Sequence, residues 1–147
     1  MENCKIVTRL LDGEFLNYSN VIPSMWDTRI RVNKNNMQNC FERISLISSS
    51  SIEKEKKYPV KVSIDIGKVI ISCTNQTGDA KEEMYVSTEG KNLEVGFNPK
   101  YFLDAFRAID DEEVFIDFGT SISPCIIRSV EDDGDYKYMI LPIRLTN

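Results

Sequence analysis

The chain of 147 residues has 41% hydrophobic and 28% charged residues and a formal net charge of −5. This composition is typical of one globular domain, and the acidic balance excludes a surface that coats nucleic acid on every side, although one basic face could still contact it. The chain contains no histidine, which excludes Ser-His-Asp and Cys-His catalysis and histidine-containing metal sites. The composition favours a binding or structural module over an enzyme, and we expect no cofactor and no bound metal.

No apolar run approaches the roughly 20 residues needed to span a bilayer, and the first residues lack the basic start and apolar block of a signal peptide. The four cysteines are widely spaced, with no C-x-x-C pair; they are Cys4, Cys40, Cys73 and Cys125. This spacing argues against zinc binding and favours reduced thiols. We therefore expect a cytoplasmic protein without membrane contact.

The pattern of apolar residues predicts two similar units after an extended start. Alternation predicts a strand at Lys5–Leu10, then a turn and an extended stretch to Trp26, where Pro23 bars a helix. The first unit has a strand at 28–33, a helix at 34–48, an exposed polar loop at 49–57 and strands at 59–65, 68–74 and 80–88. The second unit has a strand at 91–97, a helix at 98–109 and strands at 113–118, 122–128 and 136–143.

The helical segments repeat one pattern at a distance of 65 residues, because asparagine, phenylalanine and isoleucine coincide at positions 33/98, 41/106 and 44/109. Apolar residues with helical spacing form one face of each helix. These faces are Met37, Cys40, Phe41 and Ile44, and Phe102, Ala105, Phe106 and Ile109. We predict an α+β domain built from a duplicated β-α-β-β-β unit, about 28–88 and 91–143, with two helices packed on antiparallel sheet and one extra strand before it.

Three clusters of residues suggest possible chemistry. Asp110–Glu113 is the densest acidic run and permits an acid-dependent metal hydrolase, although solvated charge is the usual finding at a helix-to-strand turn. Asp132–Asp135 lacks the spacing of a calcium loop and favours a hairpin tip. The cations Lys34, Arg43, Lys100 and Arg107 lie away from the apolar helix faces. Two such helices side by side would contact phosphates without reading bases, and a solvated surface is the alternative.

The C-terminal stretch Tyr138–Leu145 is almost wholly apolar. It is either packed into the core or part of an apolar groove for a partner. Together with Arg9–Phe15, Phe97–Ala105 and Ser123-Pro124, it resembles the bacterial DNA polymerase III beta subunit, the sliding clamp, over nearly the whole chain and in the same order. The resemblance is to the C-terminal (third) domain, with residues 1–22 as the end of the preceding domain and linker and 23–147 as the domain itself.

The resemblance implies a clamp-domain fold and a non-catalytic processivity factor of DNA replication. Two chains of that family close a ring around duplex DNA without reading its sequence. The ring docks the polymerase III alpha subunit, the clamp loader and repair proteins through peptides of the form Gln-x-x-Leu-x-Leu/Phe. A stand-alone clamp-like binding or decoy module from a shortened gene is the main alternative, and the acidic hydrolase is a third.

The resemblance also assigns roles to residues. One wall of the peptide groove would comprise Leu16, Val21, Asn98, Tyr101, Ile122, Pro124, Met139, Ile140, Leu141, Pro142, Ile143 and Arg144. Leu16 and Asn20 stand where many clamps have proline and arginine, so the groove edge is expected to differ. Leu46, Ile47, Glu82 and Glu83 would form the subunit interface. Lys34, Arg43, Lys100 and Arg107 would face DNA.

Overall fold

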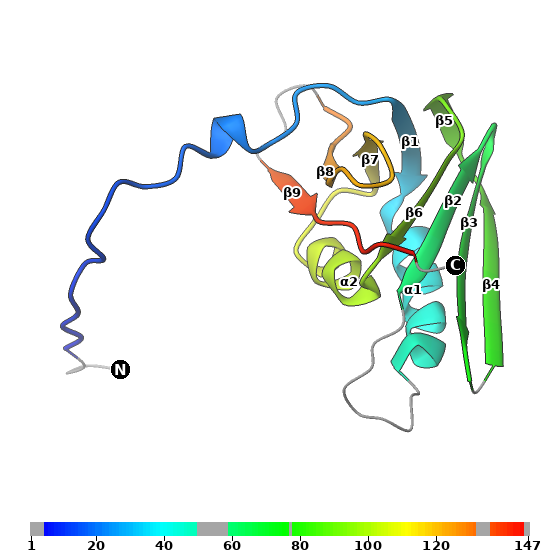
Figure 1. Cartoon of the computed structure of the whole chain (residues 1–147), viewed down its shortest axis with the longest axis horizontal. Coiled ribbons are helices and arrows are strands. Elements are labelled where there is room, and N and C mark those ends of the chain that lie inside the picture. Colours follow the sequence, from blue (N-terminus) through cyan, green and yellow to red (C-terminus); the bar gives the residue numbers. More distant parts are fainter. Residues whose placement is uncertain (1–4, 50–58, 77, 132–135, 146–147) are drawn as a thin grey trace.

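A computed structural model of the chain describes residues 5–49, 59–76, 78–131 and 136–145. Residues 5–20 extend away from the domain as an arm (Figure 1) that ends in one 3-10 turn, η1 (Tyr18–Asn20). The predicted strand at Lys5–Leu10 is wrong, because these residues have no regular secondary structure. A strand is stable only when a neighbour pairs with its backbone, and Ile6 and Leu10 are 85% and 92% exposed here.

Nine strands among the described residues form two antiparallel sheets (Figure 1). The first sheet has the order β5 (Ser87–Gly90), β1 (Thr28–Asn33), β7 (Glu113–Phe118), β8 (Cys125–Ser129) and β9 (Lys137–Ile140). The second sheet has the order β4 (Gly78–Tyr85), β3 (Lys68–Asn75), β2 (Val60–Asp65) and β6 (Leu93–Phe97). The sheet that the sequence predicts is thus divided in two.

Two helices, α1 (Lys34–Ser49) and α2 (Pro99–Arg107), pack against each other and against the sheets. Each begins at one of the repeated asparagines. The Asn33 side chain accepts a hydrogen bond from the Asn36 N–H at 3.0 Å, and the Asn98 side chain accepts one from the Lys100 N–H at 3.1 Å. Such caps satisfy backbone donors that the first helical turn leaves unpaired, which explains the coincidence of asparagine at 33 and 98.

The core lies between the helices and the sheets and is rich in phenylalanine. Phe41 of α1 stacks on Phe102 of α2 with ring centroids 4.5 Å apart and planes inclined by 9°. Phe97 and Phe106 are fully buried beside them. The predicted apolar faces of both helices are buried, so the predicted α+β duplication is confirmed.

The two units exchange their first strands. β1 of the first unit pairs with β7 of the second, while β6 of the second unit pairs with β2 of the first. Each sheet therefore contains strands from both units, and neither sheet is complete without the other unit.

Several predicted strands differ from the structure in extent. The strand predicted at 122–128 is β8 (Cys125–Ser129), which begins three residues later. The predicted strand at 80–88 is two strands, because β4 ends at Tyr85 and β5 begins at Ser87 in the other sheet. Val86 lies where the chain passes from one sheet to the other, and its N–H donates to the Gly67 carbonyl at 3.0 Å. β9 ends at Ile140, three residues before the predicted end, because Pro142 has no N–H to donate to a ladder. Of the polar loop predicted at 49–57, Ser49 is instead the last residue of α1. Residues 50–57 and the predicted hairpin tip at 132–135 lie outside the described residues.

Candidate functional site

A mostly apolar hollow lies between α2 and β9, at the open edge of the five-stranded sheet. It has a volume of about 390 Å³, and we call it the β9 hollow. Its lining residues are Tyr101, Asp104, Ala105, Tyr138, Met139, Ile140 and Leu141. Tyr101 and Leu141 are 54% and 62% exposed, although apolar side chains of their size are usually buried. Exposed apolar side chains around a concavity are typical of a binding surface.

The C-terminal segment Leu141–Leu145 is attached to β6 by one close backbone contact. The Ile143 N–H donates to the Gly96 carbonyl at 2.7 Å, and the two residues form an isolated β-bridge. A Cβ atom at position 96 would lie 2.6 Å from the Ile143 carbonyl oxygen and 2.7 Å from a Leu145 methyl carbon. Glycine at 96 therefore permits the segment to lie against the sheet beside the β9 hollow.

The structure brings four of the predicted groove residues together: Tyr101, Met139, Ile140 and Leu141 line the β9 hollow. Asn98 caps α2 and lines a separate hollow between the helices. Pro124 lines a third hollow on the outer face of the sheet. The remaining predicted groove residues do not line the β9 hollow; they are Leu16, Val21, Ile122, Pro142, Ile143 and Arg144.

The cations predicted to face DNA differ in their surroundings. The Lys34 ammonium donates to the Ile109 carbonyl at 2.9 Å, and the Arg107 guanidinium lies 3.8 Å from carboxylate oxygens of Glu42 and Asp104. Lys100 is exposed at the start of α2. Acidic neighbours thus offset part of the positive charge that the helices present.

Arg43 is bound to an acidic residue of the neighbouring sheet. Its guanidinium donates to both carboxylate oxygens of Glu82, at 2.7 and 2.8 Å. These hydrogen bonds lower the pKa of the Glu82 carboxyl group and raise the pKa of Arg43. Arg43, predicted to contact DNA, and Glu82, predicted to lie at a subunit interface, are therefore one ion pair.

The other predicted interface residues lie near β4, the strand at the open edge of the four-stranded sheet. Glu83 of β4 is paired across the strands with Lys68, with 3.9 Å between the charged atoms. Leu46 on α1 is 69% exposed, whereas Ile47 is partly buried against the core. An unpaired strand edge beside an exposed leucine can accept a neighbouring strand.

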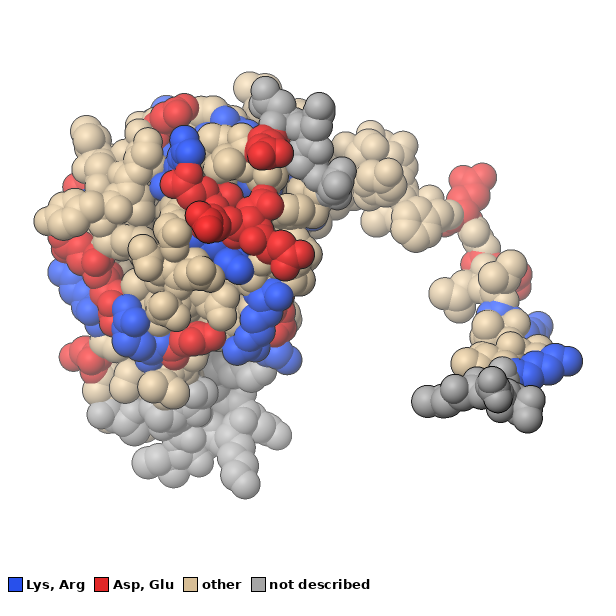
Figure 2. Space-filling model, turned by 180° about the vertical axis from the view of Figure 1, so that it is seen from behind, with Lys and Arg blue, Asp and Glu red and all other residues tan. Residues whose placement is uncertain are grey.

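The acidic run at Asp110–Glu113 forms part of a negatively charged hollow. Asp111, Glu112 and Glu113 line it together with Glu131, and Figure 2 shows acidic side chains gathered on one face of the domain. The Tyr136 hydroxyl donates to Asp111 at 2.7 Å and lowers the pKa of that carboxyl group. Among the described residues, no group of three or more histidine, cysteine or acidic side chains is arranged to hold a metal ion.

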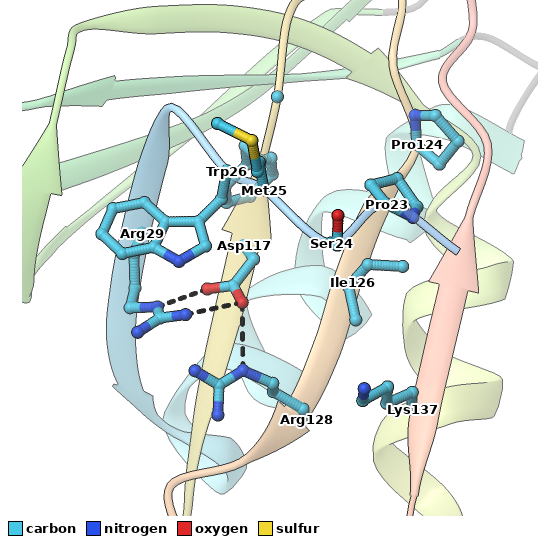
Figure 3. Close-up of a pocket in the computed structure, with 12 residues that line it drawn as sticks. Pro23, Ser24, Met25, Trp26, Arg29, Asp117, Pro124, Ile126, Arg128 and Lys137 are labelled. Atoms are coloured by element: carbon cyan, nitrogen blue, oxygen red, sulfur yellow. Dashed lines mark hydrogen bonds and ion pairs between the residues drawn. The ribbon is translucent and has the colours of Figure 1, made fainter. Parts of the chain in front are cut away.

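Sequence analysis missed a further cluster on the outer face of the five-stranded sheet. Asp117 of β7 accepts hydrogen bonds from Arg29 of β1 and Arg128 of β8 (Figure 3), and the bond to Arg29 raises the pKa of that guanidinium. The three residues line one hollow of about 300 Å³, which we call the cationic pocket. The only signal in the sequence is that each is a charged residue within a predicted strand.

A clamp-type α+β domain is defined by the exchanged strands, the two helices and the β9 hollow. The DNA polymerase III beta subunit of Thermotoga maritima has a solved structure that matches 94% of this chain with a TM-score of 0.84 and 32% sequence identity, over 36% of its own length. The DNA polymerase sliding clamp of Bacillus subtilis matches 95% of this chain with a TM-score of 0.84 and 30% identity, also over 36% of its length.

The chain belongs to the family of the DNA polymerase III beta subunit, C-terminal domain, whose model matches residues 19–144. A curated relative, the beta sliding clamp of Staphylococcus epidermidis, is 31% identical over 144 residues. That match covers 97% of this chain and 37% of the relative, so the chain spans little more than a third of the relative's length. In the part of the chain that the structure describes, no helix is long and apolar enough to cross a membrane.

Proposed function

We propose that this chain serves DNA replication as the C-terminal domain of a sliding clamp, a non-catalytic processivity factor. Residues 1–22 would be the end of the preceding clamp domain and the linker, and residues 23–147 the C-terminal domain. The family membership and the clamp-type fold support this proposal. Because the chain spans 37% of its curated relative, encirclement of duplex DNA is proposed for a protein of the family's full length.

The β9 hollow is the observation that carries the docking part of the proposal. Its apolar walls fit leucine or phenylalanine side chains of a short linear peptide, and the Tyr101 hydroxyl offers a polar group to orient the peptide. The backbone groups of β9 on the side away from β8 have no partner strand among the described residues and lie beside the hollow. Peptides of the polymerase III alpha subunit and the clamp loader are the proposed partners.

The helices carry the proposed contact with DNA. α1 and α2 pack side by side, and Lys100 and Arg107 both line the hollow between them. Contacts of such cations with phosphates are independent of base sequence, as a protein that moves along DNA requires. The pairing of Arg43 with Glu82 and of Arg107 with Glu42 and Asp104 reduces the charge available for this contact, so we expect Lys100 to contribute more.

The open edge of β4 carries the proposed subunit contact. Its backbone groups on the side away from β3 have no partner strand among the described residues, and the exposed Leu46 lies on α1, which packs against β4. A strand of a second subunit that pairs with this edge would continue the sheet across the interface. Glu82 and Glu83 would lie at that interface.

The docking proposal is tested with a fluorescent Gln-x-x-Leu-x-Leu/Phe peptide and the double variant Tyr101→Ala/Leu141→Ala. Both side chains are more than half exposed, so the fold should persist, as an amide NMR spectrum would verify. Buried aromatic and leucine contacts dominate such interfaces, so we expect the affinity measured by anisotropy to fall at least about tenfold.

The matched control is Tyr85→Ala/Ile66→Ala, which removes an equally large tyrosine and an apolar side chain from exposed positions on the other sheet. This control should bind the peptide as the parent chain does. Equal affinity of the parent chain and the Tyr101→Ala/Leu141→Ala variant would contradict the assignment of the β9 hollow.

A further inference from the structure

The cationic pocket lies on the face of the five-stranded sheet that is opposite the core. The segment Pro23–Trp26 crosses this face, with Pro23 near Pro124 and Ile126 and with Trp26 near Arg29 (Figure 3). Asp117 lies at the floor and is only 9% exposed. The pocket is therefore a small concavity with mainly apolar walls and charged groups at its base, which is the usual form of a site for a side chain or small ligand.

The charges at the base of the pocket are fixed in position. Arg29 donates to both oxygens of Asp117, at 2.5 and 2.9 Å, and Arg128 donates to one of them at 3.0 Å. The Arg29 guanidinium also lies over Trp26 and Phe115, at 4.2 and 4.8 Å from the ring centroids. Hydrogen bonds and aromatic contacts together hold both arginines in place, so little conformational entropy is lost when a ligand binds.

The pocket has more positive than negative charge. Arg29, Arg128 and Lys137 line it together with a single carboxylate, Asp117. Lys137 points from β9 over β8 toward the pocket (Figure 3) and forms no ion pair with any described residue. A surplus of positive charge is unexpected on a chain whose formal net charge is −5. This local surplus attracts an anionic group that the rest of the surface repels.

The cationic pocket and the β9 hollow are neighbours on the two sides of β9. In the β8–β9 register, Ile126 lies opposite Met139 and Arg128 lies opposite Lys137. Alternation places these four side chains on the outer face, away from the buried Ile127. Met139 and Ile126 therefore connect the β9 hollow to the cationic pocket over the width of adjacent strands, about 4.8 Å.

We propose that the cationic pocket binds an aspartate or glutamate that flanks the apolar motif of a partner peptide seated in the β9 hollow. This inference rests on the proposed function, because it assumes that a peptide occupies that hollow. An extension of two residues reaches roughly 7 Å, which is sufficient to cross β9. The carboxylate would pair with Lys137 and Arg128, which lie opposite each other in the β8–β9 register, so partner peptides with an acidic flank would be preferred over neutral ones.

The test compares the Gln-x-x-Leu-x-Leu/Phe peptide extended by Asp-Asp with the same peptide extended by Asn-Asn, at either end, by fluorescence anisotropy. We expect the acidic extension at one end to tighten binding about threefold to tenfold at low salt, with a smaller gain at high salt. The net charge of −5 alone would make acidic extensions weaken binding, so the sign of the effect is diagnostic.

Lys137→Gln assigns the effect to the pocket, because it removes an exposed charge without uncovering the buried Asp117 carboxylate. In this variant the ratio of affinities for the Asp-Asp and Asn-Asn peptides should fall to near unity. Lys81→Gln makes the same change of net charge on β4, in the other sheet, and should keep the full ratio. A Lys-Lys extension should in turn bind Lys137→Glu better than it binds the parent chain.

The possible outcomes separate the two proposals. If the Asn-Asn peptides bind and the Asp-Asp peptides bind no better, the inference is overturned while the docking function stands. If the acidic gain persists in Lys137→Gln, the anion is bound elsewhere and the inference is likewise overturned. If no peptide binds the parent chain, the proposed function and the inference fail together.

Discussion

Replacement of Gly96 with alanine should detach the C-terminal segment Leu141–Leu145 from β6 while the core stays intact. The new Cβ atom would lie 2.6 Å from the Ile143 carbonyl oxygen, whereas ordinary contacts begin at 3.4 Å. The segment must therefore move by about 0.8 Å. The hydrogen bond from the Ile143 N–H to the Gly96 carbonyl is now 2.7 Å long. After this displacement it would approach the length at which a hydrogen bond no longer adds to stability.

The change in stability and the change in binding should both be modest, each about 1 kcal/mol at most. Loss of the hydrogen bond costs about 1 kcal/mol, and alanine in an extended strand returns roughly 0.4–1 kcal/mol by restricting the unfolded chain. The free energy of unfolding should therefore change by less than about 1 kcal/mol. The β9 hollow includes Leu141, so a displaced segment should weaken peptide binding about fivefold, the equivalent of the lost hydrogen bond.

Amide hydrogen exchange and peptide anisotropy measure the two effects on the same samples. The Ile143 amide should lose protection, whereas the amide of Val95 in the ladder with β2 should keep it. The atom nearest to the new Cβ is the Ile143 backbone oxygen, so removal of the Leu145 side chain does not relieve the clash. The C-terminal segment should therefore remain detached in the double variant Gly96→Ala/Leu145→Ala. A protected Ile143 amide together with full peptide affinity in Gly96→Ala would refute the reasoning.

Two further predictions concern the helices. Phe41→Leu and Phe102→Leu each remove one ring of the stacked pair, so a double-mutant cycle measured by urea denaturation should show a coupling energy of about 0.5–1.5 kcal/mol. Strictly additive losses of stability would contradict a stabilising contribution of the ring stacking. The Glu82 carboxylate should titrate below ordinary glutamate in carbon NMR and return toward it in Arg43→Gln, because Arg43 lowers its pKa. This ion pair therefore stabilises the fold fully at pH values above the pKa of Glu82 in the unfolded chain, and the stabilisation is lost as the pH falls through the lowered pKa of Glu82 in the folded chain. An ordinary titration midpoint of Glu82 in the parent chain would exclude this stabilisation.

Local patterns predicted the helices well because the information that fixes them is local. The apolar faces that contain Phe41 and Phe106 are buried as their spacing indicates, and the asparagines at 33 and 98 are the caps at which the helices begin. The strand predicted at 113–118 has those bounds in the structure. Each of these features depends on residues only a few positions apart in the chain.

Features that depend on distant pairing could not be predicted in the same way. Val86 separates β4 from β5 in different sheets, and nothing in the alternation at 80–88 marks that crossing. Arg29 and Asp117 are 88 residues apart, so their ion pair becomes visible only when the register of β1 and β7 is known. Lys5–Leu10 has the alternation of a strand but no partner among the described residues, and alternation alone cannot supply one.

The same limit applies to the candidate site. Tyr101 lies on α2 and Leu141 directly follows β9, and the resemblance to a known family placed them together before the structure did. Leu16 and Val21, assigned by the same resemblance, lie outside the β9 hollow on the segment before β1. Their contact with a peptide stays a prediction.

The exchange of first strands explains how a duplicated unit can carry the β9 hollow at an open sheet edge. β9 has one neighbour, β8, and β8 is held by β7, which pairs with β1 of the other unit. The open edge at β9 therefore belongs to a sheet that contains strands of both units. The other strands keep this sheet stable although the outer backbone groups of β9 have no partner among the described residues. A weakened β1–β7 pairing should then disturb the β9 hollow at a distance, whereas changes at the β4 edge, in the other sheet, should leave it unaltered.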